Sequence, residues 1–154
     1  MDLASAAEEY ARSTQILLDA ARLVRTDQLE RHAEGGWSPR QILHHVADSE
    51  TQSYVRLRRL PAEPAGSLIQ GYDEAAWAAC DALGYRELAV QNSLRVFGTV
   101  RSASLDVLGR LDLDDLERYG EHSGAGRYTL AQWLDIYTAH PREHVQQLKE
   151  AVAA

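Results

Sequence analysis

The sequence is poor in cysteine and proline. It has one cysteine, Cys80, and four prolines among 154 residues. A single cysteine excludes a disulfide within the chain, so the fold does not depend on an oxidising compartment. The abundance of Ala, Leu, Glu, Arg and Gln predicts helices throughout, and no segment alternates with the period of a strand. We therefore expect an all-α fold.

Long apolar runs and an excess of basic residues are also missing. No run is long enough to span a bilayer, and residues 1–5 lack the basic and then apolar layout of a signal peptide. Acidic residues outnumber Lys and Arg by 23 to 16, which gives a net charge of -7. Phosphate binding needs a basic face, so we expect no nucleic acid and no membrane among the partners. The prediction is a cytoplasmic protein with a single domain, residues 1–154.

Hydrophobic periodicity predicts four long helices. Ser38 and Pro39 are typical of a helix start, and Gln41 completes a capping box there. Thr129 and Gln132 form the same box before the last helix. The long helices are expected at about 3–25, 38–60, 86–111 and 129–152, with short turns or helices at 26–32, 73–77 and 112–116 and loops at 61–72 and 120–127. This order predicts a four-helix bundle with short accessory helices.

Three of the six histidines are candidate metal ligands. His140 and His144 have i, i+4 spacing, which puts both rings on one helix face beside Trp133 and Tyr137. His45 lies at the inward edge of the second helix. Three imidazoles leave coordination positions open, as a catalytic metal site requires. The alternative is a set of core or boundary histidines with ordinary hydrogen bonds, and the residues alone leave both interpretations open.

Two neighbouring features bear on this site. Pro141 removes a backbone donor between the two late histidines and clashes with the carbonyl of Tyr137, so we expect a kink or local unwinding there. Asp48, one turn beyond His45, is the candidate carboxylate for orienting an imidazole. Glu143 and Asp73 are the other candidates, although such acids are more typical of a helix surface or a helix cap.

The segments 35–50 and 72–77, together with the late histidine pair, resemble the DinB-like superfamily, particularly its YfiT-like branch of metal-dependent hydrolases. The resemblance runs from about residue 5 to 150. It implies a four-helix bundle, commonly a homodimer, with one divalent ion held by three histidines. By position these match His45, rather than His44, together with His140 and His144. Proline directly after His140 departs from the pattern of the family.

The resemblance and the open histidine site imply a function. The expected ion is Zn²⁺ or Ni²⁺, since imidazole suits both. It would activate water and polarise a carbonyl of a small-molecule substrate, which is hydrolase chemistry. The same site could instead hold a thiolate, as in a thiol S-transferase. A third possibility is a metal-binding or stress-related bundle without catalysis. The sequence does not identify a proton acceptor.

Overall fold

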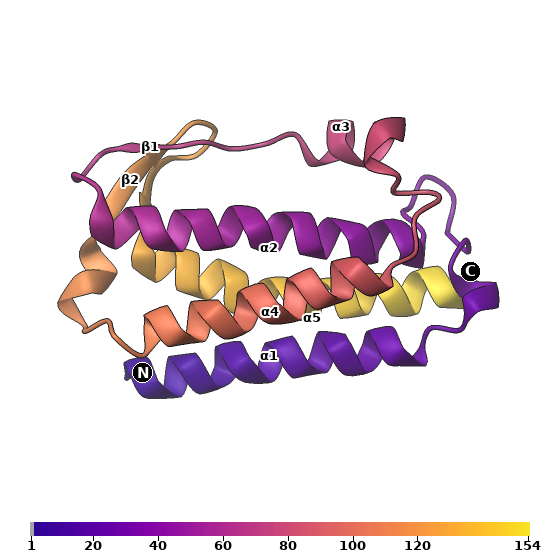
Figure 1. The fold of residues 1–154 in the computed structure, drawn as a ribbon, viewed down its shortest axis with the longest axis horizontal. Coiled ribbons are helices and arrows are strands. Elements are labelled where there is room, and N and C mark those ends of the chain that lie inside the picture. Colours follow the sequence, from indigo (N-terminus) through magenta and orange to yellow (C-terminus); the bar gives the residue numbers. More distant parts are fainter. Residues whose placement is uncertain (1) are drawn as a thin grey trace.

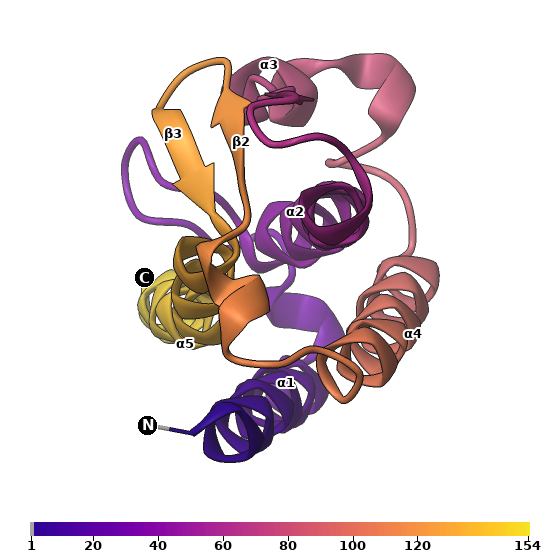
Figure 2. The ribbon, with the colours of Figure 1, turned by 90° about the vertical axis from the view of Figure 1, so that its left-hand side faces the viewer.

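Four long helices lie side by side along one axis (Figure 1). The computed structural model describes residues 2–154. The long helices are α1 (Leu3–Leu23), α2 (Pro39–Ala62), α4 (Gln91–Leu108) and α5 (Leu130–Ala153). Viewed end-on, α1 and α2 lie on opposite sides, and each packs against both α4 and α5 (Figure 2). The predicted four-helix bundle is confirmed.

Short elements connect the long helices. They are the helix α3 (Glu74–Ala79) and three 3₁₀ turns, η1 (Thr26–Gln28), η2 (Asp81–Leu83) and η3 (Asp114–Glu117). The segment between α2 and α4 runs back along the outside of α2, with α3 above the N-terminal half of that helix (Figure 1). This return places α3 over the part of α2 that carries the candidate histidine.

The helix starts form as their residues predict. The Ser38 hydroxyl accepts the amide N–H of Gln41, and the Gln41 side chain accepts the N–H of Ser38 at 3.0 Å. Thr129 and Gln132 make the same reciprocal pair at the start of α5. Each box satisfies backbone donors that the first helical turn leaves without partners, so these ends are set locally.

The apolar faces of the four helices form the core of the bundle. One cluster of buried side chains includes Leu17, Val46 and Phe97, and a second surrounds Trp133 and Leu57. Trp133 is fully buried, and its indole N–H donates to the carbonyl of Ser53 at 3.0 Å. Because the core holds α2 against α5, it determines which polar residues of these two helices face each other.

A small sheet replaces two of the expected loops, so the prediction was wrong there. β1 (Leu68–Ile69) pairs in parallel with β2 (Tyr119–His122), which pairs antiparallel with β3 (Gly126–Thr129). Strands of two to four residues are too short to show a period of two. The chain passes close to Gly120 in this sheet, since a Cβ there would lie 2.7 Å from the carbonyl oxygen of Ser67 and 2.6 Å from Ile69 Cγ1. The sheet thus ties the chain after α2 to the start of α5.

Three helix boundaries or interruptions differ from the prediction. α2 continues through Pro61, because a proline in the last turn costs one hydrogen bond only. α4 begins at Gln91, later than expected, because the carbonyl of Gly84 accepts the N–H groups of Glu87 and Leu88 in a preceding turn. α5 is helical without interruption, so the local unwinding predicted at Pro141 is absent. A search of residues 2–154 finds no helix with the length and apolar character needed to cross a membrane.

Candidate metal centre

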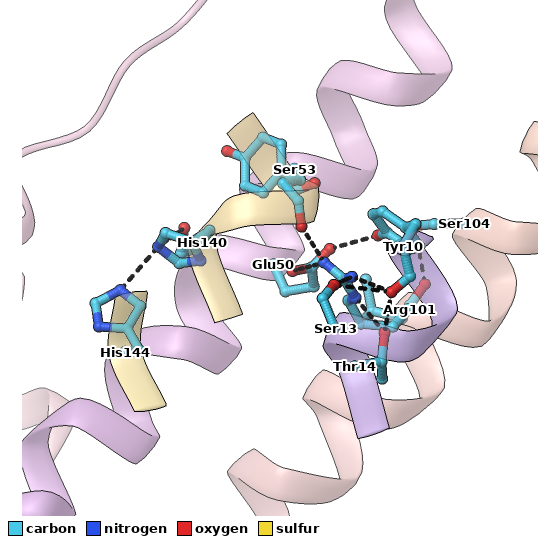
Figure 3. A network of polar contacts seen from close by, with 12 residues as sticks. Tyr10, Ser13, Thr14, Glu50, Ser53, Arg101, Ser104, His140 and His144 are labelled. Atoms are coloured by element: carbon cyan, nitrogen blue, oxygen red, sulfur yellow. Dashed lines mark hydrogen bonds and ion pairs between the residues drawn. The ribbon is translucent and has the colours of Figure 1, made fainter. Parts of the chain in front are cut away.

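The structure brings three histidines together between α2 and α5. His45 comes from α2, while His140 and His144 lie one turn apart on α5. One ring nitrogen from each lies within 4.8 Å of the others. The two Nε2 atoms of the α5 pair are 2.9 Å apart (Figure 3). The His45 ring is centred 4.7 Å from that of His144 and 5.6 Å from that of His140.

The spacing of the α5 pair and the hydrogen bond of His144 suit a shared metal ion. Two nitrogens that bind one ion at about 2.1 Å, at right angles, lie about 3 Å apart, close to the spacing of the α5 pair. His144 Nδ1 is 2.7 Å from the amide oxygen of Gln147. Because this oxygen only accepts, Nδ1 carries the proton and Nε2 presents its lone pair toward His140. The donor set is therefore one that a divalent transition metal can use.

The protein holds these imidazoles in the neutral form. Burial lowers the pKa of His45 from 6.5 to about 4, with a smaller contribution from His144. Burial, then His144 and His45, lowers the pKa of His140 to about 2. Burial also lowers the pKa of His144, against the opposing hydrogen bond to Gln147. Neutral imidazole is the form that binds a metal, so no proton needs to leave first at pH 7.

Glu74 brings a carboxylate to the triad. Its Oε2 is 3.9 Å from His45 Nε2, and its side chain is 55% exposed, in contrast to the buried ring. Among residues 2–154 no other acid has a carboxylate oxygen within 4.0 Å of the three imidazoles. Glu74 opens α3, where the Asp73 carboxylate accepts the N–H of Ala76 at 2.9 Å. Packing of Tyr72 against Trp77 at 4.7 Å holds this segment together.

Sequence reasoning missed Glu74. The segment 72–77 was one of the signals for the family, and Asp73 was weighed as a candidate carboxylate. Asp73 instead caps α3, which leaves the next residue to face His45. The choice between two adjacent acids depends on how the return segment lies over α2, and a local pattern does not contain that information.

Asp48 has a different partner from the one predicted. Its Oδ2 accepts the hydroxyl of Tyr85 at 2.7 Å. No hydrogen bond among residues 2–154 joins it to an imidazole, and the Nδ1 atoms of His45 and His140 are buried without partners. No contact therefore supports the prediction that Asp48 orients an imidazole.

Two aromatic residues lie beside the triad, whereas His44, Glu143 and Cys80 lie apart from it. Trp37 meets the His45 ring edge-on at 4.9 Å and so lines the site. Tyr137 accepts a hydrogen bond from Arg56 at 2.9 Å, and its ring lies 5.9 Å from that of His140. His44 instead bonds Ser93 and the carbonyl of Leu88 through its two ring nitrogens. Glu143 and Cys80 are exposed.

The fold and the three facing histidines define a class, a helical bundle whose interior imidazoles could hold a metal ion. Residues 9–148 match the family model of the DinB superfamily, and the chain belongs to this superfamily. It is 33% identical over 114 residues to proteins of Bacillus cereus (strain AH820) and Bacillus anthracis (strain A0248) named "putative metal-dependent hydrolase". These matches cover 74% of this chain and 64% of the relatives, so the chain spans less than two thirds of their length.

Two solved structures share the fold. YfiT from Bacillus subtilis, described as "a probable metal-dependent hydrolase with an unusual four-helix bundle topology", superposes with a TM-score of 0.87 at 24% identity, covering 97% of this chain and 85% of its own. TT2238, described as a four-helix bundle protein, superposes with a TM-score of 0.67 at 21% identity, covering 96% of this chain and 98% of its own. The predicted family is confirmed.

Proposed function

We propose that the protein binds one divalent ion through His45, His140 and His144 and acts as a metal-dependent hydrolase on a small molecule. The observation that carries this proposal is the convergence of three neutral imidazoles from two helices, of which His45 and His144 are buried and His140 is half-buried. The names of the relatives support it. Zn²⁺ and Ni²⁺ are the proposed ions, since both accept imidazole ligands.

The ion and the residues around the triad have separate roles in the proposed hydrolysis. A divalent ion held there supplies a Lewis acid for water and for a substrate carbonyl. Glu74 Oε2, beside His45 Nε2 and open to solvent, takes the proton from the attacking nucleophile. The Trp37 ring packs edge-on against that of His45 and lines this side of the site.

Metal content tests the site directly. Protein purified without a nickel column should contain about one divalent ion per chain by elemental analysis, as a three-ligand site predicts. His144→Ala should lose it. His32→Ala, which removes an exposed imidazole outside the triad, is the matched control and should keep the wild-type content. Equal, near-zero content in all three proteins would remove the metal proposal.

Activity tests the reaction class. Esters and amides are compared with electrophiles supplied with a small thiol, each with and without chelator. Hydrolysis that the chelator abolishes supports the proposal, whereas chelator-sensitive conjugation of the thiol would identify an S-transferase. Glu74→Gln should keep its metal and lose roughly 10²- to 10⁴-fold in kcat, the usual contribution of a general base. Unchanged kcat would exclude Glu74 as the proton acceptor.

The homodimer and the cytoplasmic location stay predictions. Light scattering of the purified chain checks the first, because it gives the mass of the particle in solution. Fractionation of cells that produce the protein checks the second.

A further inference from the structure

A second buried polar cluster lies beside the histidines (Figure 3). Its centre is Arg101 of α4, whose side chain is fully buried. Arg101 pairs with Glu50 of α2, which is also fully buried, at 3.3 Å. The guanidinium donates to the other helices as well, at 2.6–2.8 Å: to Thr14 Oγ1, Ser13 Oγ, the carbonyl of Tyr10 and the carbonyl of Tyr137. One cation therefore contacts all three neighbouring long helices.

The bond to the Tyr137 carbonyl replaces a backbone hydrogen bond that α5 cannot form. In an α-helix the carbonyl of residue 137 accepts the N–H of residue 141. That residue is Pro141, which has no N–H. Both residues are buried, so water is a poor substitute. Arg101 Nη1 supplies the missing donor at 2.6 Å, the shortest of its hydrogen bonds.

His140 lies on the turn of α5 that this bond holds. It directly precedes Pro141, and its ring contacts that of Tyr137 at 5.9 Å. A second contact comes from α2, where Ser49, the residue before Glu50, has its hydroxyl 3.4 Å from His140 Nε2. The cluster therefore restrains His140 through the backbone of α5, and Ser49 contacts the ring from α2.

We propose that Arg101 is a positioning residue for His140. Its guanidinium donates to the Tyr137 carbonyl, which has no N–H partner at Pro141, and so fixes the α5 turn that carries this ring. The role rests on the proposed function, since its consequence is the geometry of a metal ligand. It also accounts for an unbroken α5 despite a buried proline between two candidate ligands. A purely structural Glu50–Arg101 pair would stabilise the bundle without depending on the residue at position 141.

A double-mutant cycle separates the two roles. Arg101→Met is made together with Glu50→Gln, so that no buried carboxylate is left without its cation, and Glu50→Gln alone, in which Arg101 keeps its four neutral acceptors, is the reference. Pro141→Ala returns an N–H to the Tyr137 carbonyl. Relative to the reference, we expect the Arg101→Met protein to bind Zn²⁺ roughly 10- to 100-fold more weakly in chelator competition, the usual effect of losing a group that orients a ligand. Adding Pro141→Ala should restore most of that affinity, and the Co²⁺ absorption spectrum should return with it.

The outcomes discriminate between the roles. Zn²⁺ affinity equal to that of the reference, or a loss that Pro141→Ala does not relieve, would overturn the proposal and leave a structural ion pair. If the Arg101→Met protein does not fold, the cycle is repeated with Arg101→Lys in the chain that keeps Glu50, with the wild type as reference, because a single ammonium keeps a cation beside Glu50 but cannot donate in all the directions of the planar guanidinium.

A measurement on the metal-free protein distinguishes failure of this proposal from failure of the proposed function. The NMR signal of His140 Hε1 in the metal-free protein should shift in the Arg101 variant and return with Pro141→Ala. Wild-type protein that binds no Zn²⁺ would refute the metal site. The NMR cycle would still decide whether Arg101 positions the ring, and an unchanged signal would overturn that claim.

Discussion

Acid should destabilise the metal-free protein through its clustered histidines. Burial lowers the pKa of His45 to about 4 and that of His140 to about 2 in the folded chain, whereas an unfolded chain protonates both near 6.5. Well above pH 6.5 the folded and unfolded chains both hold neutral imidazoles, so the free energy of unfolding does not depend on their protonation. Below it the unfolded chain binds protons that the folded chain does not, so stability falls as the pH falls.

The size of the effect follows from the same two pKa values. Each histidine that is protonated only in the unfolded chain contributes a slope of up to about 1.4 kcal/mol per pH unit. Integrated from pH 6.5 to pH 5.5, the loss is about 1 kcal/mol per ring, or about 2 kcal/mol for His45 and His140 together. His144 adds to it, because burial lowers its pKa as well. Against a typical total of about 5–15 kcal/mol, this loss is readily measured.

Urea unfolding, followed by circular dichroism in the presence of chelator, measures this loss at pH 7.5, 6.5 and 5.5. His140→Gln removes one of the rings, so its loss between the two lower pH values should be smaller by about 1 kcal/mol. His32→Gln changes an exposed ring outside the triad and should follow the wild type. Equal losses in the wild type and His140→Gln would refute the argument that burial keeps this imidazole neutral.

Three further substitutions test other parts of the structure. Asp48→Asn should leave Zn²⁺ affinity in chelator competition unchanged, because this carboxylate bonds Tyr85; a tenfold loss would return Asp48 to the site. Gly120→Ala should destabilise the protein by roughly 1–3 kcal/mol in urea unfolding, because the new Cβ would lie 2.6 Å from Ile69 Cγ1. A cost below about 0.5 kcal/mol would show that β1 is not held against β2. Leu17→Ala should cost about 2–5 kcal/mol in the same assay, since the side chain is fully buried, and a smaller loss would mean that the cavity collapses.

The long helices could be predicted because their signals are local. The capping boxes at Ser38 and Thr129 join residues three apart, and the apolar faces repeat within each helix. The i, i+4 pair of His140 and His144 is local in the same sense, since helix geometry alone puts both rings on one face. Helical periodicity put His45 at the inward edge of the second helix, and the match to the family pattern selected it over His44.

Contacts between distant residues were beyond local reasoning. The strands around Gly120 are too short to show a period, and their pairing joins segments some fifty residues apart. Glu74 and Asp73 are equivalent as acids in one turn, and only the path of the chain over α2 separates them. Arg101 had no feature in the sequence that marked it as the donor to α5.

The sequence by itself determined the helices, their starts and the pairing of two histidines on one helix, because each depends on residues within a turn or two of one another. Only the tertiary structure decided that His45 meets that pair, that Glu74 lies beside it and that Arg101 replaces the donor missing at Pro141. These contacts arise when apolar faces pack both α4 and α5 against α2, and the burial that results suppresses protonation of the imidazoles.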